Sequence, residues 1–185
     1  MGRADEILDL AQEMIQTRGF NAFSFQDIAH ELGIKKASVQ FYFPKKEDLG
    51  QKVVQRYCDR FDTFLAELDR ENLDLKEALA RYLVPFYQVS QGGNLVCLCG
   101  VLGGEFVSLP TQVQQEVETF FRKQESWLTQ CLAKGAERGE FSPKASPAAC
   151  AKSFFAALQG ALIIARSRHD PDYFHQVAQT LQRIT

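Results

Sequence analysis

Residues 24–49, with the sequence SFQDIAHELGIKKASVQFYFPKKEDL, constrain the fold more than any other stretch of the chain. Ser24 is a favourable N-cap, and Asp27 stands at the position of its capping-box partner. Gly33 supplies the left-handed residue that commonly follows the end of a helix. The stretch therefore predicts one helix before Gly33 and a second, short helix over residues 36–41, an arrangement typical of a helix-turn-helix motif.

The predicted second helix has a buried side and an exposed side. Ala37, Val39 and Phe41 are expected to face partly buried ground. The other positions face outward, and all of them carry hydrogen-bond donors: Lys36, Ser38, Gln40 and Tyr42. A short helix held by a tight turn fits the major groove of DNA.

The exposed side chains suit contacts with double-stranded DNA. Gln40 can read the edge of a base, adenine best, and Lys36 can reach a guanine edge or a phosphate. The remaining contacts are expected to go mostly to backbone oxygens. The predicted DNA-binding residues are Gln26, Lys35, Lys36, Ser38, Gln40, Phe41, Tyr42 and Lys46. On these residues alone, a surface helical hairpin whose lysines serve only solubility is the alternative.

The stretch IAHELGIKKASVQFYFPKKEDL follows an N-terminal helix that ends in RGFNAFSF. Together they resemble the DNA-binding domain of the TetR family of bacterial transcriptional repressors. The match runs from about Ile7 to Val54 and includes the helix-ending Arg18-Gly19-Phe20 and the Tyr42-Phe43-Pro44 block. The family often has Tyr where Gln40 stands and His or another polar aromatic residue where Phe41 stands. Both positions choose bases, so the operator sequence does not carry over.

Composition and charge fit a DNA-binding protein of the cytoplasm. The 185 residues carry a net charge of -2, but residues 33–60 hold seven Lys or Arg against three acidic residues. The basic surplus therefore coincides with the proposed reading head. The start, MGRADEILDL, does not resemble a signal peptide, and no run of about 18 apolar residues is expected to cross a bilayer.

The sequence carries no pattern that favours an enzyme, a metal site or a cofactor. Five cysteines at positions 58, 97, 99, 131 and 150 form no paired framework, which is typical of a reducing compartment. The three histidines are scattered, and no nucleophile-elbow, P-loop or dinucleotide-binding motif occurs.

Hydrophobic periodicity predicts an all-α chain of about nine helices. We expect a helix-turn-helix domain over residues 1–48, with its motif at 24–43, and an effector-binding and dimerisation domain over residues 49–185. Capping and apolar patterns predict further helices over residues 4–17, 46–68, 75–91, 95–107, 111–138, 147–167 and 171–184.

The predicted helix 147–167 is hydrophobic nearly all round, which favours a second partner for its exposed face. We expect helices 147–167 and 171–184 to form a two-fold, four-helix dimer interface. Its predicted residues are Phe154, Leu158, Ala161, Leu162, Ala165, Phe174, Val177 and Leu181. A central helix of a monomer is the alternative.

Aromatic residues from several predicted helices form either a core or a pocket. The TetR resemblance implies an effector cavity in this region, with polar groups such as Tyr82, Gln88, Glu105 or Gln124. The predicted effector-binding residues are Tyr82, Phe86, Cys97, Phe106, Phe120, Gln124, Trp127 and Phe155. Binding there is expected to change the distance between two reading heads.

Cys97 lies in LVCLCGVLGGEFVSLP, a segment similar to a cysteine-bearing and glutamate-bearing helix of the NemR-like subgroup, whose cysteine senses electrophiles. A small buried residue with an inert thiol is the alternative for Cys97.

Together these features predict a ligand-responsive transcriptional repressor without enzymatic activity, which binds a palindromic operator as a homodimer. Activation in place of repression stays open. The alternative from another class is a helical protein-interaction module without sequence-specific DNA binding. A small thiol-dependent enzyme is a third reading, and the sequence places no base near a cysteine.

Overall fold

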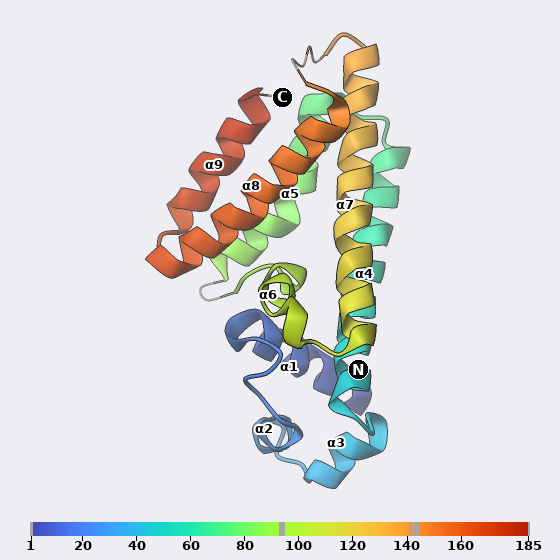
Figure 1. Cartoon of the computed structure of the whole chain (residues 1–185), viewed down its shortest axis with the longest axis vertical. Coiled ribbons are helices and arrows are strands. Elements are labelled where there is room, and N and C mark those ends of the chain that lie inside the picture. The colour runs from blue at the N-terminus through green and yellow to red at the C-terminus, as the bar shows by residue number, and fades with distance from the viewer. Residues whose placement is uncertain (1, 93–94, 141, 143–144, 185) are drawn as a thin grey trace. The chain divides into compact units, whose positions relative to one another are not determined.

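The structure is a computed structural model of the 185-residue chain and describes residues 2–92, 95–140, 142 and 145–184. These residues form nine α-helices and one 3-10 helix, and no β-strand occurs among them (Figure 1). The predicted all-α fold is confirmed. The helices are α1 (Arg3–Arg18), α2 (Phe25–Glu31), α3 (Lys36–Tyr42), α4 (Lys46–Arg70), α5 (Leu75–Gln91), α6 (Leu98–Gly104), the 3-10 helix η1 (Phe106–Ser108), α7 (Thr111–Glu137), α8 (Pro147–Arg168) and α9 (Pro171–Ile184).

The chain divides into two compact units, each built from two stretches of sequence. Unit 1 comprises Met1–Arg60 and Leu98–Thr119, and unit 2 comprises Phe61–Cys97 and Phe120–Thr185. The units therefore do not divide at residue 48, where the sequence suggested a boundary. Periodicity describes single helices, so it does not indicate that the segment around α6 packs with the N-terminal helices.

Unit 1 is built around the buried face of α1, which packs against α2 and α6. The buried residues of this face include the predicted apolar positions Ile7, Leu8, Ala11, Met14 and Ile15. Gly50 on α4 allows a close approach, because a Cβ there would lie 2.5 Å from the Phe20 ring and 3.2 Å from Val113.

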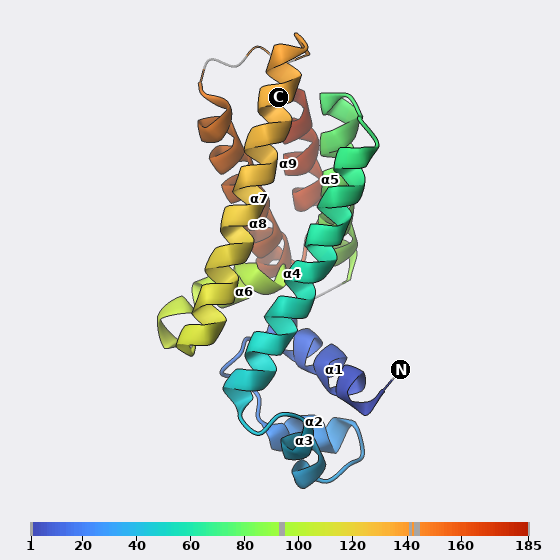
Figure 2. The same cartoon turned by 90° about the vertical axis from the view of Figure 1, so that its right-hand side faces the viewer.

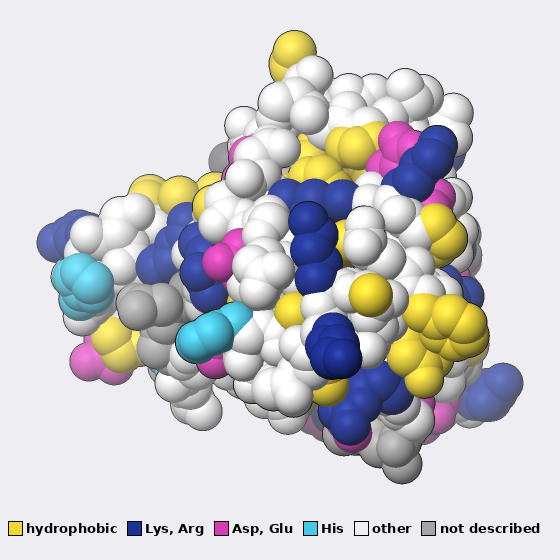
Figure 3. Space-filling model, turned by 90° about the horizontal axis from the view of Figure 1, so that it is seen from below, with side chains coloured by type: hydrophobic (Ala, Val, Ile, Leu, Met, Phe, Trp, Pro, Cys, Tyr) yellow, Lys and Arg dark blue, Asp and Glu magenta, His cyan; other side chains and the backbone are white. Residues whose placement is uncertain are grey.

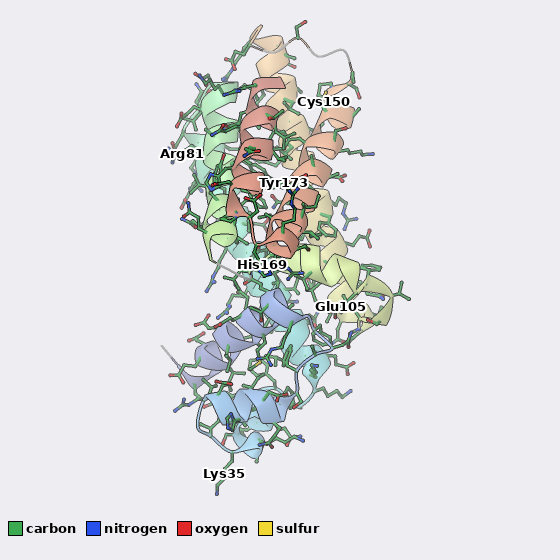
Figure 4. All side chains as sticks on the ribbon, turned by 90° about the vertical axis from the view of Figure 1, so that its left-hand side faces the viewer. Lys35, Arg81, Glu105, Cys150, His169 and Tyr173 are labelled. Carbon is green, nitrogen blue, oxygen red and sulfur yellow. The ribbon has the colours of Figure 1, made fainter. Side chains whose placement is uncertain are left out.

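The turn after α6 is hydrogen-bonded to the turn after α1. The Glu105 carboxylate accepts hydrogen bonds from the backbone N and the Nδ2 of Asn21, at 3.3 and 3.1 Å. Gly19 leaves room for this carboxylate, since a Cβ at that position would collide with it. Glu105, labelled in Figure 4, was expected as a polar group of the effector cavity, and the structure makes it part of unit 1 instead.

Helix α6 is shorter than predicted. The sequence suggested one helix over residues 95–107, whereas α6 covers Leu98–Gly104 and the next three residues form η1. Glycines weaken the helix, and Pro110 favours an extended conformation at Leu109, whose φ and ψ are -78° and 150°. Val107, the last residue of the predicted helix, is 95% exposed.

Unit 2 packs α5, α8 and α9 against one another (Figure 2). Helix α8 has a mean hydropathy of 1.6 over its most apolar window, so by length and composition it could cross a membrane. A core helix meets the same requirement, and α8 buries residues against α5 and α9, among them Phe154 and Leu158.

Candidate nucleic-acid interface

The helix-turn-helix begins at a fully formed capping box. The Ser24 hydroxyl accepts a hydrogen bond from the backbone N of Gln26 at 3.2 Å. Asp27 Oδ2 accepts hydrogen bonds from the Ser24 backbone N at 2.6 Å and from its hydroxyl at 2.7 Å. These hydrogen bonds with Ser24 stabilise the charged carboxylate and hold the pKa of Asp27 below its usual value. The capping predicted from the sequence is confirmed.

Gly33 forms the turn between α2 and α3 with a left-handed φ of 63°. The backbone N of Ile34 then donates a hydrogen bond to the Ala29 carbonyl at 2.9 Å, which closes the end of α2. Lys35 is the N-cap residue of α3, and its side chain forms no capping hydrogen bond. Its side chain extends away from the ribbon (Figure 4).

Val39 anchors α3, since it is fully buried while its neighbours face solvent. Lys36, Gln40 and Tyr42 are exposed as predicted, and Ser38 is half-buried. The prediction for Ala37 and Phe41 is wrong: Ala37 is exposed, and 81% of the surface of Phe41 is exposed. Helix α3 has only seven residues, which is too short for a full buried stripe. Val39 is its one buried residue.

The exposed end of unit 1 that carries α2 and α3 has a mixed basic and apolar surface. Viewed from that end, Lys and Arg side chains lie beside hydrophobic side chains (Figure 3). Five of the predicted DNA-binding side chains lie exposed on α3 or the turn before it: Lys35, Lys36, Gln40, Phe41 and Tyr42. Gln26 is exposed on α2. A surface of donors and cations on one short helix suits DNA contacts.

Lys46 differs from the other predicted DNA-binding residues because its ammonium group turns into unit 1. Its Nζ lies 4.7 Å from the ring centroid of Phe20 and 4.3 Å from that of Phe23. It also donates a hydrogen bond to the Phe23 carbonyl. Burial lowers the pKa of Lys46. The structure gives Lys46 a structural role, and its phosphate contact stays a prediction.

Most predicted effector residues are brought together in unit 2 as a closely packed aromatic cluster. The Tyr82 and Trp127 rings stack with centroids 5.1 Å apart, and the Tyr82 and Phe86 centroids lie 5.4 Å apart. The Phe120 and Phe155 centroids are 6.5 Å apart. Phe106 is an exception, because it belongs to unit 1 and is 37% exposed. These residues therefore pack as a core rather than line an open pocket, as the alternative in the sequence analysis had it.

Two polar side chains lie inside this cluster. The Tyr82 hydroxyl donates a hydrogen bond to Gln124 Oε1 at 2.9 Å, and both residues are fully buried. Burial raises the pKa of Tyr82 well above its usual value, so the hydroxyl stays a donor. Gln124 Nε2 is buried without a hydrogen-bond partner among the described atoms. Both residues were predicted as polar groups of the effector site. The unpaired amide nitrogen of Gln124 could be identified only from the structure.

Trp127 borders a small cavity at the ends of α4 and α7. The cavity has a volume of about 50 Å³, and Cys131 and Arg138 also line it. This volume suits one or a few water molecules rather than a drug-sized ligand.

The cysteines are free thiols with different exposure. Cys97 is fully buried, as is Cys99, and Cys131 is partly buried. Burial raises the pKa of Cys131 to about 11, which keeps its thiol protonated.

The predicted dimer residues lie mostly inside a single chain. Seven of the eight are buried in unit 2: Phe154, Leu158, Ala161, Leu162, Ala165, Phe174 and Leu181. Val177 is half-buried. These residues stay a prediction for the dimer interface, and their burial within one chain leaves them little surface for a second copy, because an all-round apolar helix does not indicate which stripe faces its own core. Ile163 and Ile164 are instead 41% and 39% exposed.

Comparison with known proteins agrees with the arrangement of the capped helix-turn-helix and the helical remainder. Residues 7–53 match the family described as bacterial regulatory proteins, tetR family. Residues 88–181 match the tetracyclin repressor-like, C-terminal domain. The HTH-type transcriptional repressor ComR of Escherichia coli is 26% identical over 183 residues, which cover 97% of this chain and 87% of ComR.

Two solved structures extend the comparison to the whole fold. A TetR family transcriptional regulator from Agrobacterium tumefaciens is 34% identical, with a TM-score of 0.92 over 98% of this chain and 97% of that chain. E. coli NemR in its reduced form is 19% identical and shares the fold, with a TM-score of 0.81 over 98% of this chain and 96% of that chain. The chain therefore belongs to the TetR family of bacterial transcriptional regulators.

Proposed function

We propose that this protein is a repressor in the cytoplasm that binds a palindromic operator as a homodimer and is released by a small, largely apolar or electrophilic effector. The surface of α3 carries the proposal. Lys36, Gln40 and Tyr42 are exposed on a helix that Val39 fixes to the domain. Surface donors on a rigid helix can read base edges and phosphates.

Fluorescence anisotropy with DNA from upstream of the protein's own gene tests operator binding. We expect tight binding that weakens steeply with salt and prefers this fragment over unrelated DNA. Gln40→Ala is expected to reduce that preference, whereas Lys36→Ala mainly reduces the salt dependence if it contacts phosphate. Equal, weak binding to both DNA fragments would favour the alternative of a helical protein-interaction module.

We propose that the dimer uses an exposed stripe on α8. Ala156, Gly160, Ile163 and Ile164 recur at helical spacing, and each is exposed or half-buried in the single chain. A Cβ at Gly160 would meet no atom within 4 Å, so a facing helix can come close there. A two-fold interface then brings the same stripe of a second copy against it.

The effector site is proposed to form where Tyr82 and Gln124 meet. A buried donor without a partner costs roughly 1–3 kcal/mol, and a ligand with an acceptor would satisfy Gln124 Nε2. The aromatic rings around it favour a largely apolar ligand. The cluster would have to open to admit this ligand, which couples binding to a change in packing.

A double variant tests this site without leaving a new unpaired group. Tyr82→Phe with Gln124→Leu removes both partners of the hydrogen bond, so the fold is expected to persist. DNA binding should remain, while release by an apolar, acceptor-bearing compound found by screening should be lost. A double variant that still responds to that compound would place the effector elsewhere.

Cys97 is the alternative sensor, for electrophilic effectors. Its complete burial means that an electrophile must reach the thiol through a local opening. Cys97→Ser should abolish the release of DNA by quinones or aldehydes if the thiol reacts. An unchanged response would remove the electrophile hypothesis and leave Cys97 as a packing residue.

A further inference from the structure

Phe41 keeps a large apolar ring in water near the C-terminal end of α3. Its exposed fraction of 81% is far above the 42% of the adjacent Tyr42. Leaving an aromatic side chain exposed forgoes the free energy of burying it, roughly 1.5–3 kcal/mol. A partner that covers the ring would recover this free energy.

Both apolar and basic side chains lie around the Phe41 ring. Its ring meets the Tyr42 ring edge to face, with centroids 5.3 Å apart and an interplanar angle of 85°. Ile34 and Ala37 join Phe41 in lining an open hollow of about 540 Å³, and Lys35 also lines it. The lysine gives this apolar surface an affinity for a polyanion.

A phenyl ring selects one feature of the DNA major groove. It has no hydrogen-bond donor or acceptor, so it cannot recognise guanine, cytosine or adenine by their polar edges. The C5-methyl group of thymine is the apolar feature that base edges present there. We infer that Phe41 reads a thymine C5-methyl group in each half of the operator, an inference that rests on the proposed operator binding.

The test removes the methyl group without changing base pairing. A duplex is first selected from a random DNA library with the full-length protein, and each thymine is then replaced singly by 2′-deoxyuridine. We expect one position in each half-site at which the replacement weakens binding about three- to fivefold, as for the loss of one buried carbon. Replacement at both positions should weaken binding about tenfold or more.

Two variants assign the methyl contact to Phe41. Phe41→Ala is expected to bind the selected duplex more weakly and to bind the thymine and deoxyuridine duplexes equally. Its fold should be unchanged because the ring is exposed, which circular dichroism checks. Val107→Ala is the matched control, because Val107 is an exposed apolar residue of the same unit at 95% exposure. It should behave as the unaltered protein does.

The outcomes separate this inference from the proposed function. Wild-type binding that is indifferent to deoxyuridine at every thymine would overturn the role of Phe41 while operator binding stands. Methyl sensitivity that persists in Phe41→Ala would assign the methyl contact to another residue. Failure to select any duplex would count against operator binding itself.

Discussion

Asp27 stabilises the start of α2 through hydrogen bonds that need its negative charge. Its pKa lies below the ordinary value of 3.8, mainly because the Ser24 hydroxyl and backbone N donate to it. This stabilisation is therefore present above pH 3.8 and is lost as the pH falls through the lower pKa of the folded protein. Asp27→Asn should melt at a lower temperature near neutral pH, with a difference from wild type that shrinks below pH 3.8.

Thermal unfolding followed by circular dichroism at several pH values measures this difference. Glu31→Gln is a suitable control, because Glu31 is exposed on the same helix and takes no part in the capping box. A difference between Asp27→Asn and wild type that stays constant down to about pH 3 would contradict the assignment.

Lys46 is expected to stabilise unit 1 as well as any DNA complex. Lys46→Ala removes a cation from two aromatic rings, and should lower the free energy of unfolding by about 1–2 kcal/mol. Urea denaturation without DNA measures this loss. Lys45→Ala should leave stability nearly unchanged, since the exposed Lys45 forms its ion pair with Glu47 at the surface. Equal stabilities of the two variants would exclude a stabilising role for Lys46 and leave only the predicted DNA contact.

At the scale of helices, Gly50 shows how one missing side chain fixes a packing distance. Alanine normally favours a helix over glycine by about 1 kcal/mol. A Cβ at Gly50 would lie 2.5 Å from the Phe20 ring, so Gly50→Ala should instead destabilise the protein by about 1–3 kcal/mol. Gly104→Ala is the control, because a Cβ there meets nothing within 4 Å. Thermal unfolding measures both variants. Gly50→Ala should lower the melting temperature, whereas Gly104→Ala should raise it or leave it unchanged.

Local signals in the sequence predicted most helices, though not the length of α6, and they did not indicate which elements pack together. Ser24 and Gly33 predict the ends of α2 because capping depends on neighbouring residues. Glu105 could not be assigned in this way, since its partner Asn21 lies 84 residues away. The same limit applies to the exposure of Phe41, which periodicity assigned to the wrong side of a helix too short to have a full buried stripe.

The effector region shows the corresponding limit for a site. The sequence named Tyr82 and Gln124 among the polar groups, and the structure brings them into hydrogen-bond contact. It could not separate packed core from open cavity, because both require the same aromatic residues. Phe106 was predicted to join them because it is aromatic, although it belongs to the other unit.

At the scale of the whole molecule, the proposed palindromic operator would be bound by two reading heads, and the exposed α8 stripe is the proposed route to a dimer. Ile164→Glu would place a charge in a close helix contact, where burying it without a partner is costly. We expect this variant to sediment as a monomer at micromolar concentration, while wild type sediments as a dimer. Its operator affinity should fall by orders of magnitude, because one reading head then acts alone.

The control for this variant changes charge on a different helix of unit 2. Lys76→Gln alters an exposed residue of α5, so it should leave both the dimer and operator binding intact. A monomeric wild-type protein at micromolar concentration would remove the dimer proposal. A dimeric Ile164→Glu variant that still binds the operator would move the interface to another surface. Since the Phe and Leu side chains of α8 are buried within one chain, that surface would have to include a different helix.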